Sequence, residues 1–161
     1  TVALDGDGFA FMAVASSRTG LSRVYRAVTI GRSIDSAASR NFVYSGVNLK
    51  PLAPVYLNGS RHPATADWSL DWVRRTRIGG DWRDSVEVAL GETTESYDLE
   101  IWTSGYGTLK RTLSVSSPTA TYTSAQQVAD FGSNQATLTL RIYQLSSAVG
   151  RGTALSTTIT R

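Results

Sequence analysis

Polar and apolar side chains alternate along much of the chain, in short stretches separated by turn-forming residues. From Trp68 to Trp72 every second residue is apolar, and a second such stretch runs from Tyr97 to Ile101. A period of two residues places alternate side chains on opposite faces of a strand, as in a sheet that packs one face on a core. The pattern therefore predicts strands with one buried face.

The same pattern predicts seven short strands after Pro51, the number expected of an immunoglobulin-like sandwich. We place them at 55–57, 68–77, 86–90, 97–102, 108–115, 138–143 and 154–160, with a further extended piece at 118–122. Their predicted core residues are Trp68, Leu70, Trp72, Leu138, Leu140 and Ile142. The sequence thus predicts an all-β fold, a fibronectin type III or immunoglobulin-like sandwich.

Two local signals refine this picture. Asn58-Gly59 is interpreted as the turn that ends the first strand, because Asn-Gly pairs favour tight hairpin turns. One stretch predicts a helix after Thr123 or Ser124, either of which can cap it, and Gly132 is available at its end. Two turns of helix do not persist alone, so we expect packing to stabilise this segment.

The segment Lys50-Pro51-Leu52-Ala53-Pro54 marks the expected domain boundary, because two prolines favour extended backbone and disfavour helix. Residues 51–161 are predicted to form the sandwich. Residues 1–50 are predicted to form a small β element, the end of a preceding domain. Within it, the apolar run from Phe9 and the stretch from Leu21 to Gly31 are expected to pair as a hairpin around Arg18-Thr19-Gly20.

The composition excludes several kinds of functional site. The chain has no cysteine and one histidine, His62, which excludes thiolate metal sites and zinc sites built on several histidines. The formal net charge of +3 comes from residues 1–50, since residues 51–161 balance. This spread of charge does not predict direct nucleic-acid recognition. No apolar run is long enough to predict a transmembrane segment.

No reaction motif is present. The sequence lacks a nucleophile elbow, a phosphate-binding loop and a metalloprotease motif, so no catalytic, cofactor-binding or metal-binding residue is predicted. Asp98 and Glu100 share one strand face and lie near Glu92 and Glu95, which leaves a carboxylate pair open. We interpret these acids as solvated side chains, and the chain as a protein that is not an enzyme.

Three residues near predicted turns are candidate partner contacts: Trp82, Tyr106 and Arg151. Large rigid aromatic side chains give contact area at low entropic cost, and they can stack on sugars or on another protein. The two aromatic rings can equally pack back onto the end of the core. Both interpretations stay open for Tyr106, and packing onto the core is preferred for Trp82.

Several blocks occur in a distinctive order: LKPLAPVYL, DWSLDWVRRTRIGGDW, VALGETTESYDLEIW, TYTSAQQVADFG and LRIYQLSSAVGRG. This succession, over roughly residues 45–155, resembles the C-terminal part of the tail-hub or tail-tip proteins of long-tailed phages and gene transfer agents. In that family the segment is a fibronectin type III-like domain. The resemblance implies a homotrimeric parent protein at the distal end of the phage tail in the virion.

The function implied by the resemblance is that of a structural and attachment module. It implies contacts with other tail-tip proteins and with a host surface receptor or glycan, and it brings no catalytic residues or cofactors. An alternative from another class is a carbohydrate-binding β-sandwich accessory to an enzyme, in which Trp82, Trp102 and Tyr106 form an aromatic row. A glycan hydrolase based on residues 92–100 is the least favoured alternative.

Overall fold

The computed structural model describes residues 15–81 and 88–161. The chain divides into two compact units, Thr1–Asn48 and Leu49–Arg161. This division lies two residues before the boundary expected at 50/51.

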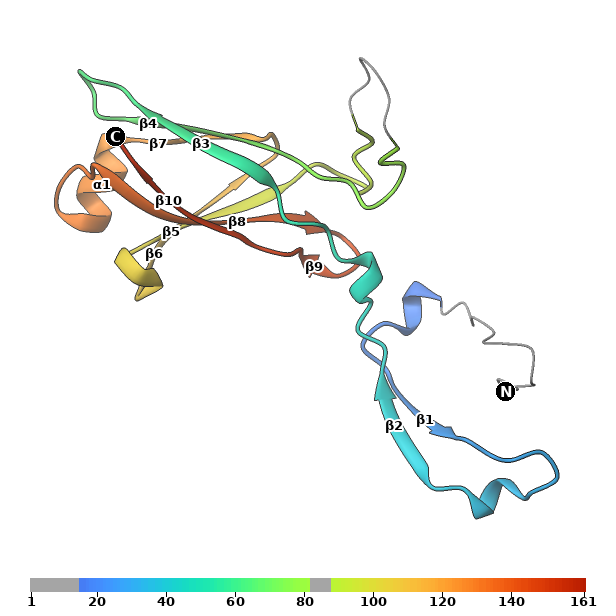
Figure 1. The fold of residues 1–161 in the computed structure, drawn as a ribbon. Coiled ribbons are helices and arrows are strands. Elements are labelled where there is room, and N and C mark those ends of the chain that lie inside the picture. The colour runs from blue at the N-terminus through green and yellow to red at the C-terminus, as the bar shows by residue number, and fades with distance from the viewer. Residues whose placement is uncertain (1–14, 82–87) are drawn as a thin grey trace. The chain divides into compact units, whose positions relative to one another are not determined.

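The second unit is an antiparallel β-sandwich (Figure 1). One sheet has the order β3-β4-β7, and the other has the order β10-β8-β5-β6, with the short β9 beside β8. The first sheet comprises β3 (Val55–Arg61), β4 (Trp68–Val73) and β7 (Thr119–Tyr122). The second comprises β5 (Tyr97–Trp102), β6 (Leu109–Val115), β8 (Thr137–Ser146), β9 (Gly150–Arg151) and β10 (Leu155–Thr160). This strand order is that of a fibronectin type III domain, which confirms the predicted fold class.

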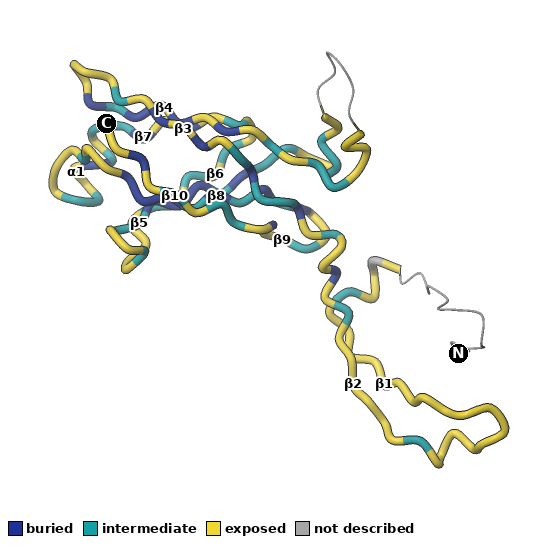
Figure 2. Tube along the Cα trace, in the orientation of Figure 1, coloured by how far each residue is buried: buried dark blue, intermediate teal, exposed yellow. Residues whose placement is uncertain are grey.

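The core lies between the two sheets, and its buried residues are dark blue in Figure 2. In β4 buried and exposed residues alternate strictly, with Trp68, Leu70 and Trp72 pointing inward. In β8 the buried side chains include Leu138, Leu140 and Ile142. All six residues predicted as core are at most 3% exposed. Alternation along each strand thus places the tryptophans inside.

The interpretation of Asn58-Gly59 as a turn was wrong. Strand β3 continues through both residues to Arg61, and Gly59 pairs with Leu70 of β4. A Cβ on Gly59 would lie 2.8 Å from Leu70 Cδ2 and 3.1 Å from Trp68 Cε3. The glycine is required because these large core side chains approach the backbone closely, so its role is packing.

Two other strand predictions differ from the structure. The strand predicted at 68–77 ends at Val73, and residues 88–90 of the piece predicted at 86–90 have no strand pairing. The remainder of that piece, 86–87, falls outside the described residues. After Val73 the chain leaves the sheet, and Arg74 and Arg77 bind the acidic side chains of Glu95 and Glu92.

Helix α1 (Ser124–Phe131) links the sheets at one end of the sandwich (Figure 1). Thr123 and Gln126 form a capping box: the Gln126 amide donates to Thr123 Oγ1 at 3.2 Å, and the Thr123 amide donates to Gln126 Oε1 at 2.9 Å. Gly132 ends the helix with φ of 78°. The predicted helix is confirmed, with Thr123 as its N-cap. The short 3₁₀ helix η4 (Ser104–Tyr106) lies between β5 and β6.

The first unit contains a two-stranded hairpin, β1 (Ser22–Arg26) with β2 (Ser39–Val43). Short 3₁₀ helices occur at η1 (Ser16–Arg18), η2 (Ile34–Ser36) and η3 (Val47–Leu49). The predicted partner of the 21–31 stretch, the run from Phe9, lies outside the described residues apart from Ala15. The described partner is β2, and Arg26 supports this pairing through Ser39 and Asp35.

Candidate interaction end of the sandwich

Two loops meet at one end of the sandwich, the end where β5 begins and β8 finishes. Tyr97 of β5 pairs with Gln144 of β8, so the segment 74–96 before β5 and the turn 147–149 after β8 emerge together. In fibronectin-like and immunoglobulin-like sandwiches, loops gathered at one end are free to recognise a partner while the sheets hold them. This end is the candidate interaction site.

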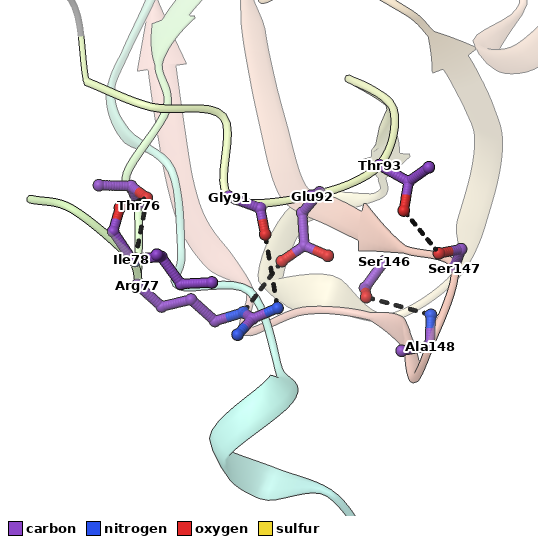
Figure 3. A network of polar contacts seen from close by, with 9 residues as sticks. All are labelled: Thr76, Arg77, Ile78, Gly91, Glu92, Thr93, Ser146, Ser147 and Ala148. Atoms are coloured by element: carbon purple, nitrogen blue, oxygen red, sulfur yellow. Dashed lines mark hydrogen bonds and ion pairs between the residues drawn. The ribbon is translucent and has the colours of Figure 1, made fainter. Parts of the chain in front are cut away.

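The segment 74–96 is closed at its base by two arginine–glutamate pairs. Arg77 Nε donates to Glu92 Oε1 at 3.0 Å, and Arg77 Nη2 donates to the Gly91 carbonyl at 3.4 Å (Figure 3). Arg74 Nη1 donates to Glu95 Oε1 at 3.2 Å. The Glu92 side chain is only 5% exposed, so its charge is held by Arg77 away from water. The two described parts of this segment, 74–81 and 88–96, are therefore tied to each other by charge pairs.

The turn after β8 contacts the same segment. Thr93 Oγ1 and Ser147 Oγ lie 3.3 Å apart, and Ser146 Oγ accepts from the Ala148 amide at 3.2 Å (Figure 3). The start of the unit lies beside the segment that follows β9, since the Thr153 amide donates to the Pro51 carbonyl at 2.9 Å. Hydroxyl and backbone contacts thus join three separate parts of the chain here.

Beneath these loops, Tyr97 connects the surface pairs to the core. Its hydroxyl donates to Glu95 Oε1 at 2.7 Å, and its ring packs edge-on against Trp72 with centroids 5.2 Å apart. Burial, and then the hydrogen bond to the Glu95 carboxylate, raise the pKa of Tyr97 above its usual range. The hydroxyl therefore stays protonated and donating at neutral pH.

Arg151 pairs with two acids on the outer face of the larger sheet. Its guanidinium contacts Asp98 Oδ2 at 2.8 Å and Glu100 Oε1 at 2.6 Å. Its Cζ also lies 4.8 Å from the ring centroid of Tyr143. The Glu100 side chain is 4% exposed and accepts from Trp102 Nε1 at 3.0 Å. Glu100 is thus a buried acid with two donors.

The structure therefore corrects the interpretation of Glu92, Glu95, Asp98 and Glu100 as solvated side chains. Each of the four has an arginine partner: Arg77 for Glu92, Arg74 for Glu95, and Arg151 for both Asp98 and Glu100. The sequence contained a usable signal, since arginines and acids occur in similar numbers in residues 51–161. Their pairing was not visible because the partners are far apart along the chain.

The candidate partner contacts occupy different settings. Tyr106 is half-buried and folds back onto the larger sheet, where its hydroxyl donates to the Leu140 and Thr157 carbonyls, both at 3.4 Å. The Arg141 guanidinium lies 4.3 Å from the Tyr106 ring centroid and 5.0 Å from that of Trp102. Arginine thus packs against both rings. Trp82 lies outside the described residues.

Chemistry elsewhere in the described part of the chain is sparse. Residues 15–81 and 88–161 contain no group of three His, Cys, Asp or Glu side chains suited to hold a metal ion. His62 is exposed, and its Nδ1 accepts from the Thr65 amide at 3.1 Å. Within the same ranges, no helix has the length and hydropathy needed to cross a membrane.

No protein-family model and no curated protein matches the chain. Among solved structures, the chain is similar to domains d3–d4 of the rat CD45 extracellular region, with a TM-score of 0.45, 14% identity, 99% of this chain covered and 73% of that chain. It is also similar to the FN5 domain of Drosophila Lar, with a TM-score of 0.40, 12% identity, 68% of this chain covered and 95% of that chain. The fold assignment rests on the strand order described above.

Proposed function

We propose that the chain is a structural and attachment module of the tail tip of a long-tailed phage or gene transfer agent. In this proposal the sandwich stands at the distal end of the tail, in a homotrimeric parent protein, and its loops meet other tail-tip proteins or the host surface. The module works by binding and by holding its shape, and it catalyses no reaction.

One observation carries the proposal: the sequence blocks that resemble the tail-tip family interlock through their side chains. The WVRRTR block provides Arg74 and Arg77, and the LGETTESY block provides Glu95 and Glu92 as their partners. The VGRG block provides Arg151, which binds two acids of β5. Blocks that bind one another support a role as a rigid scaffold for loops.

The charges at this end also favour a scaffold over an enzyme. A carboxyl that works as a general acid must lie within hydrogen-bond reach of the substrate. Glu100 is buried but lies 2.6 Å from Arg151, and Glu92 lies 3.0 Å from Arg77. Both carboxylates are occupied by guanidinium groups, so these acids suit structural ion pairs better than contact with a substrate.

The carbohydrate-binding alternative receives less support. Sugar-binding aromatic rows present ring faces to the ligand, whereas the Arg141 guanidinium packs on the rings of both Trp102 and Tyr106. Arginine stacked on an aromatic ring is a stabilising contact in its own right. Two of the three rings proposed for such a row are therefore already engaged.

The test is to place the chain on intact particles. Antibodies raised against the full 161-residue chain are applied with gold labels to particles released by the source organism. We expect label at the distal tail end, abolished by prior incubation of the antibody with the purified chain. Label on the capsid or along the tail tube, or no label on any particle, would overturn the proposal.

A second experiment distinguishes a role in host attachment from a purely structural role. Particles are mixed with host cells in the presence of monovalent antibody fragments against the chain, and unadsorbed particles are counted. Attachment predicts that fragments directed against residues 88–96 or 147–149 reduce adsorption more than fragments directed against the turn at 62–67. Equal adsorption under both treatments would contradict a role in attachment and would be consistent only with a structural role.

A further inference from the structure

The hairpin of the first unit has apolar side chains on both faces, and all of them are exposed. Every residue of β1 and β2 is exposed, including Val24 at 66% and Phe42 at 57%. The register puts Val24 and Val43 on one face and Tyr25 and Phe42 on the other. A two-stranded hairpin is at best marginally stable in water without further packing. This hairpin therefore gains stability when another element covers it.

The outer edge of β2 is open to pairing. One edge of the strand bonds to β1, and no other strand in the described residues pairs with it. An open edge presents N–H and C=O groups that another extended chain can match. Binding by strand addition takes its affinity from these backbone groups and its selectivity from alternate side chains.

The side chains along this edge define the charge of a partner. Arg40 has no ion pair or hydrogen bond with the described residues, whereas Arg26 of β1 binds Asp35 at 3.3 Å and Ser39 at 2.9 Å. Two positions from Arg40 on the same face, the Phe42 ring contacts the Tyr25 ring, with centroids 6.2 Å apart. An adjacent strand would thus meet a cation and then an apolar surface.

We propose that the outer edge of β2 binds an extended segment of a second polypeptide in which an acidic residue and an apolar residue stand two positions apart, and so lie on one face of the added strand. The acidic side chain lies beside Arg40, and an apolar side chain lies beside Phe42, while the two backbones form an antiparallel or parallel ladder. Opposite charges side by side on neighbouring strands stabilise pairing and set the register. This proposal stands independently of the tail-tip function.

Other occupants fit the observations less well. A membrane surface requires one apolar face, but the apolar side chains of the hairpin are divided between both. A second copy of this chain offers the acidic stretch 92–100, but its four acids already bind arginines within the sandwich. Charge complementarity therefore favours a different, acidic strand.

The test uses the full chain and a defined probe, the capped peptide Thr-Glu-Thr-Val-Thr-Glu-Thr with a fluorescent label, in which Glu and Val lie on one face two positions apart. Binding is measured by anisotropy at low ionic strength, and amide hydrogen exchange is followed in the same mixture. We expect the peptide to slow exchange of the amides of β2 more than those of β1. The variant Arg40→Glu should weaken binding by about tenfold, because a like charge replaces an opposite one.

Two controls keep the result specific. Arg32→Glu makes the same charge change in the loop between the strands and should alter the affinity by less than about twofold. The charge-reversed peptide Thr-Lys-Thr-Val-Thr-Lys-Thr should bind Arg40→Glu better than it binds the unchanged chain, which shows that the variant hairpin still forms. Equal losses for Arg40→Glu and Arg32→Glu would overturn the proposal.

Three further outcomes would also overturn it. One is the absence of peptide binding to the unchanged chain. Another is binding to vesicles of phosphatidylglycerol with no binding to the acidic peptide, which would identify a membrane surface as the occupant. The third is full protection of the β2 amides before peptide is added, which would show that the chain itself already covers this edge.

Discussion

The carboxylate of Asp130 in helix α1 is bound at both oxygens by Arg111 of β6. Arg111 Nε donates to Oδ2 at 2.6 Å, and Arg111 Nη2 donates to Oδ1 at 2.9 Å. Tyr122 adds a third donor to the same carboxylate, at 2.8 Å. This bidentate pair ties the short helix to the edge of the larger sheet.

Removing this pair should destabilise the sandwich. The Asp130 side chain is 9% exposed, so Arg111→Met leaves a carboxylate with its main partner gone and little water to replace it. We expect the free energy of unfolding to fall by about 2 kcal/mol, measured by urea denaturation. Arg75→Met, at an exposed position, is the matched control. Equal effects of the two variants would contradict the structural role of Arg111.

Acid should unfold the chain partly through Asp130 and Asp67. Burial opposes ionisation of Asp130, but hydrogen bonds from Arg111 and Tyr122 outweigh it and lower its pKa. The Ser124 amide, followed by Thr65, lowers the pKa of Asp67. A lowered pKa gives stability that is present above the unfolded value of about 3.9 and is lost as the pH falls through the folded value.

We therefore expect stability to fall as the pH drops below about 4. The measurement is a series of urea titrations between neutral and acidic pH. Asp130→Asn should be less stable than the unchanged chain at neutral pH and should lose less stability on acidification. Parallel pH curves for the two proteins would contradict a lowered pKa at this position.

Alkaline pH should destabilise the fold through the ionisation of Tyr97 and Tyr122. Burial raises the pKa of each above its usual range, and the hydrogen bonds to Glu95 and Asp130 raise it further. The neutral hydroxyls therefore give stability that is complete below the unfolded pKa of about 10 and is lost as the pH rises beyond it. Tyrosinate absorbance and circular dichroism should change together at high pH. Tyr122→Phe should reduce this alkaline loss, whereas Tyr56→Phe, at a residue 76% exposed, should not.

Gly152 should tolerate no side chain. A Cβ there would lie 2.8 Å from Pro51 Cβ, and equally close to the carbonyl oxygens of Pro51 and Gln144. Because two of these contacts are backbone, Gly152→Ala must displace the Pro51 segment or the end of β8, at a cost of about 2 kcal/mol. Thermal unfolding measures the effect against the exposed control Ser156→Ala. An unchanged melting temperature would show that the junction can relax.

The sequence was sufficient to predict structural features that depend on residues close together in one strand or helix. The alternation from Trp68 to Trp72 predicted buried tryptophans, and Thr123 or Ser124 together with Gly132 marked the helix ends. These features depend on residues within a few positions of one another. The prediction of a turn at Asn58-Gly59 was wrong because turn propensity depends on neighbouring residues along the chain. The glycine is required instead by Leu70 and Trp68, which approach it from the adjacent strand.

The candidate site depended on contacts that sequence spacing does not reveal. Arg151 lies more than fifty residues from Asp98 and Glu100, yet the strand pairing brings their charges into contact. Gln127 is fully buried, and its amide donates to the Ala66 carbonyl at 2.8 Å, across a similar separation. Burial of such groups is favourable only when every partner is in place, and only the folded topology supplies them.

The sequence alone therefore determined that this chain forms a sandwich of strands with tryptophans inside, because alternation needs only the period of a strand. The tertiary structure decided which acids became ion pairs, which aromatic rings were covered by arginine, and which strand β1 joined. Those outcomes depend on which strand lies beside which, because charge and hydrogen-bond pairing act only over a few ångströms in space.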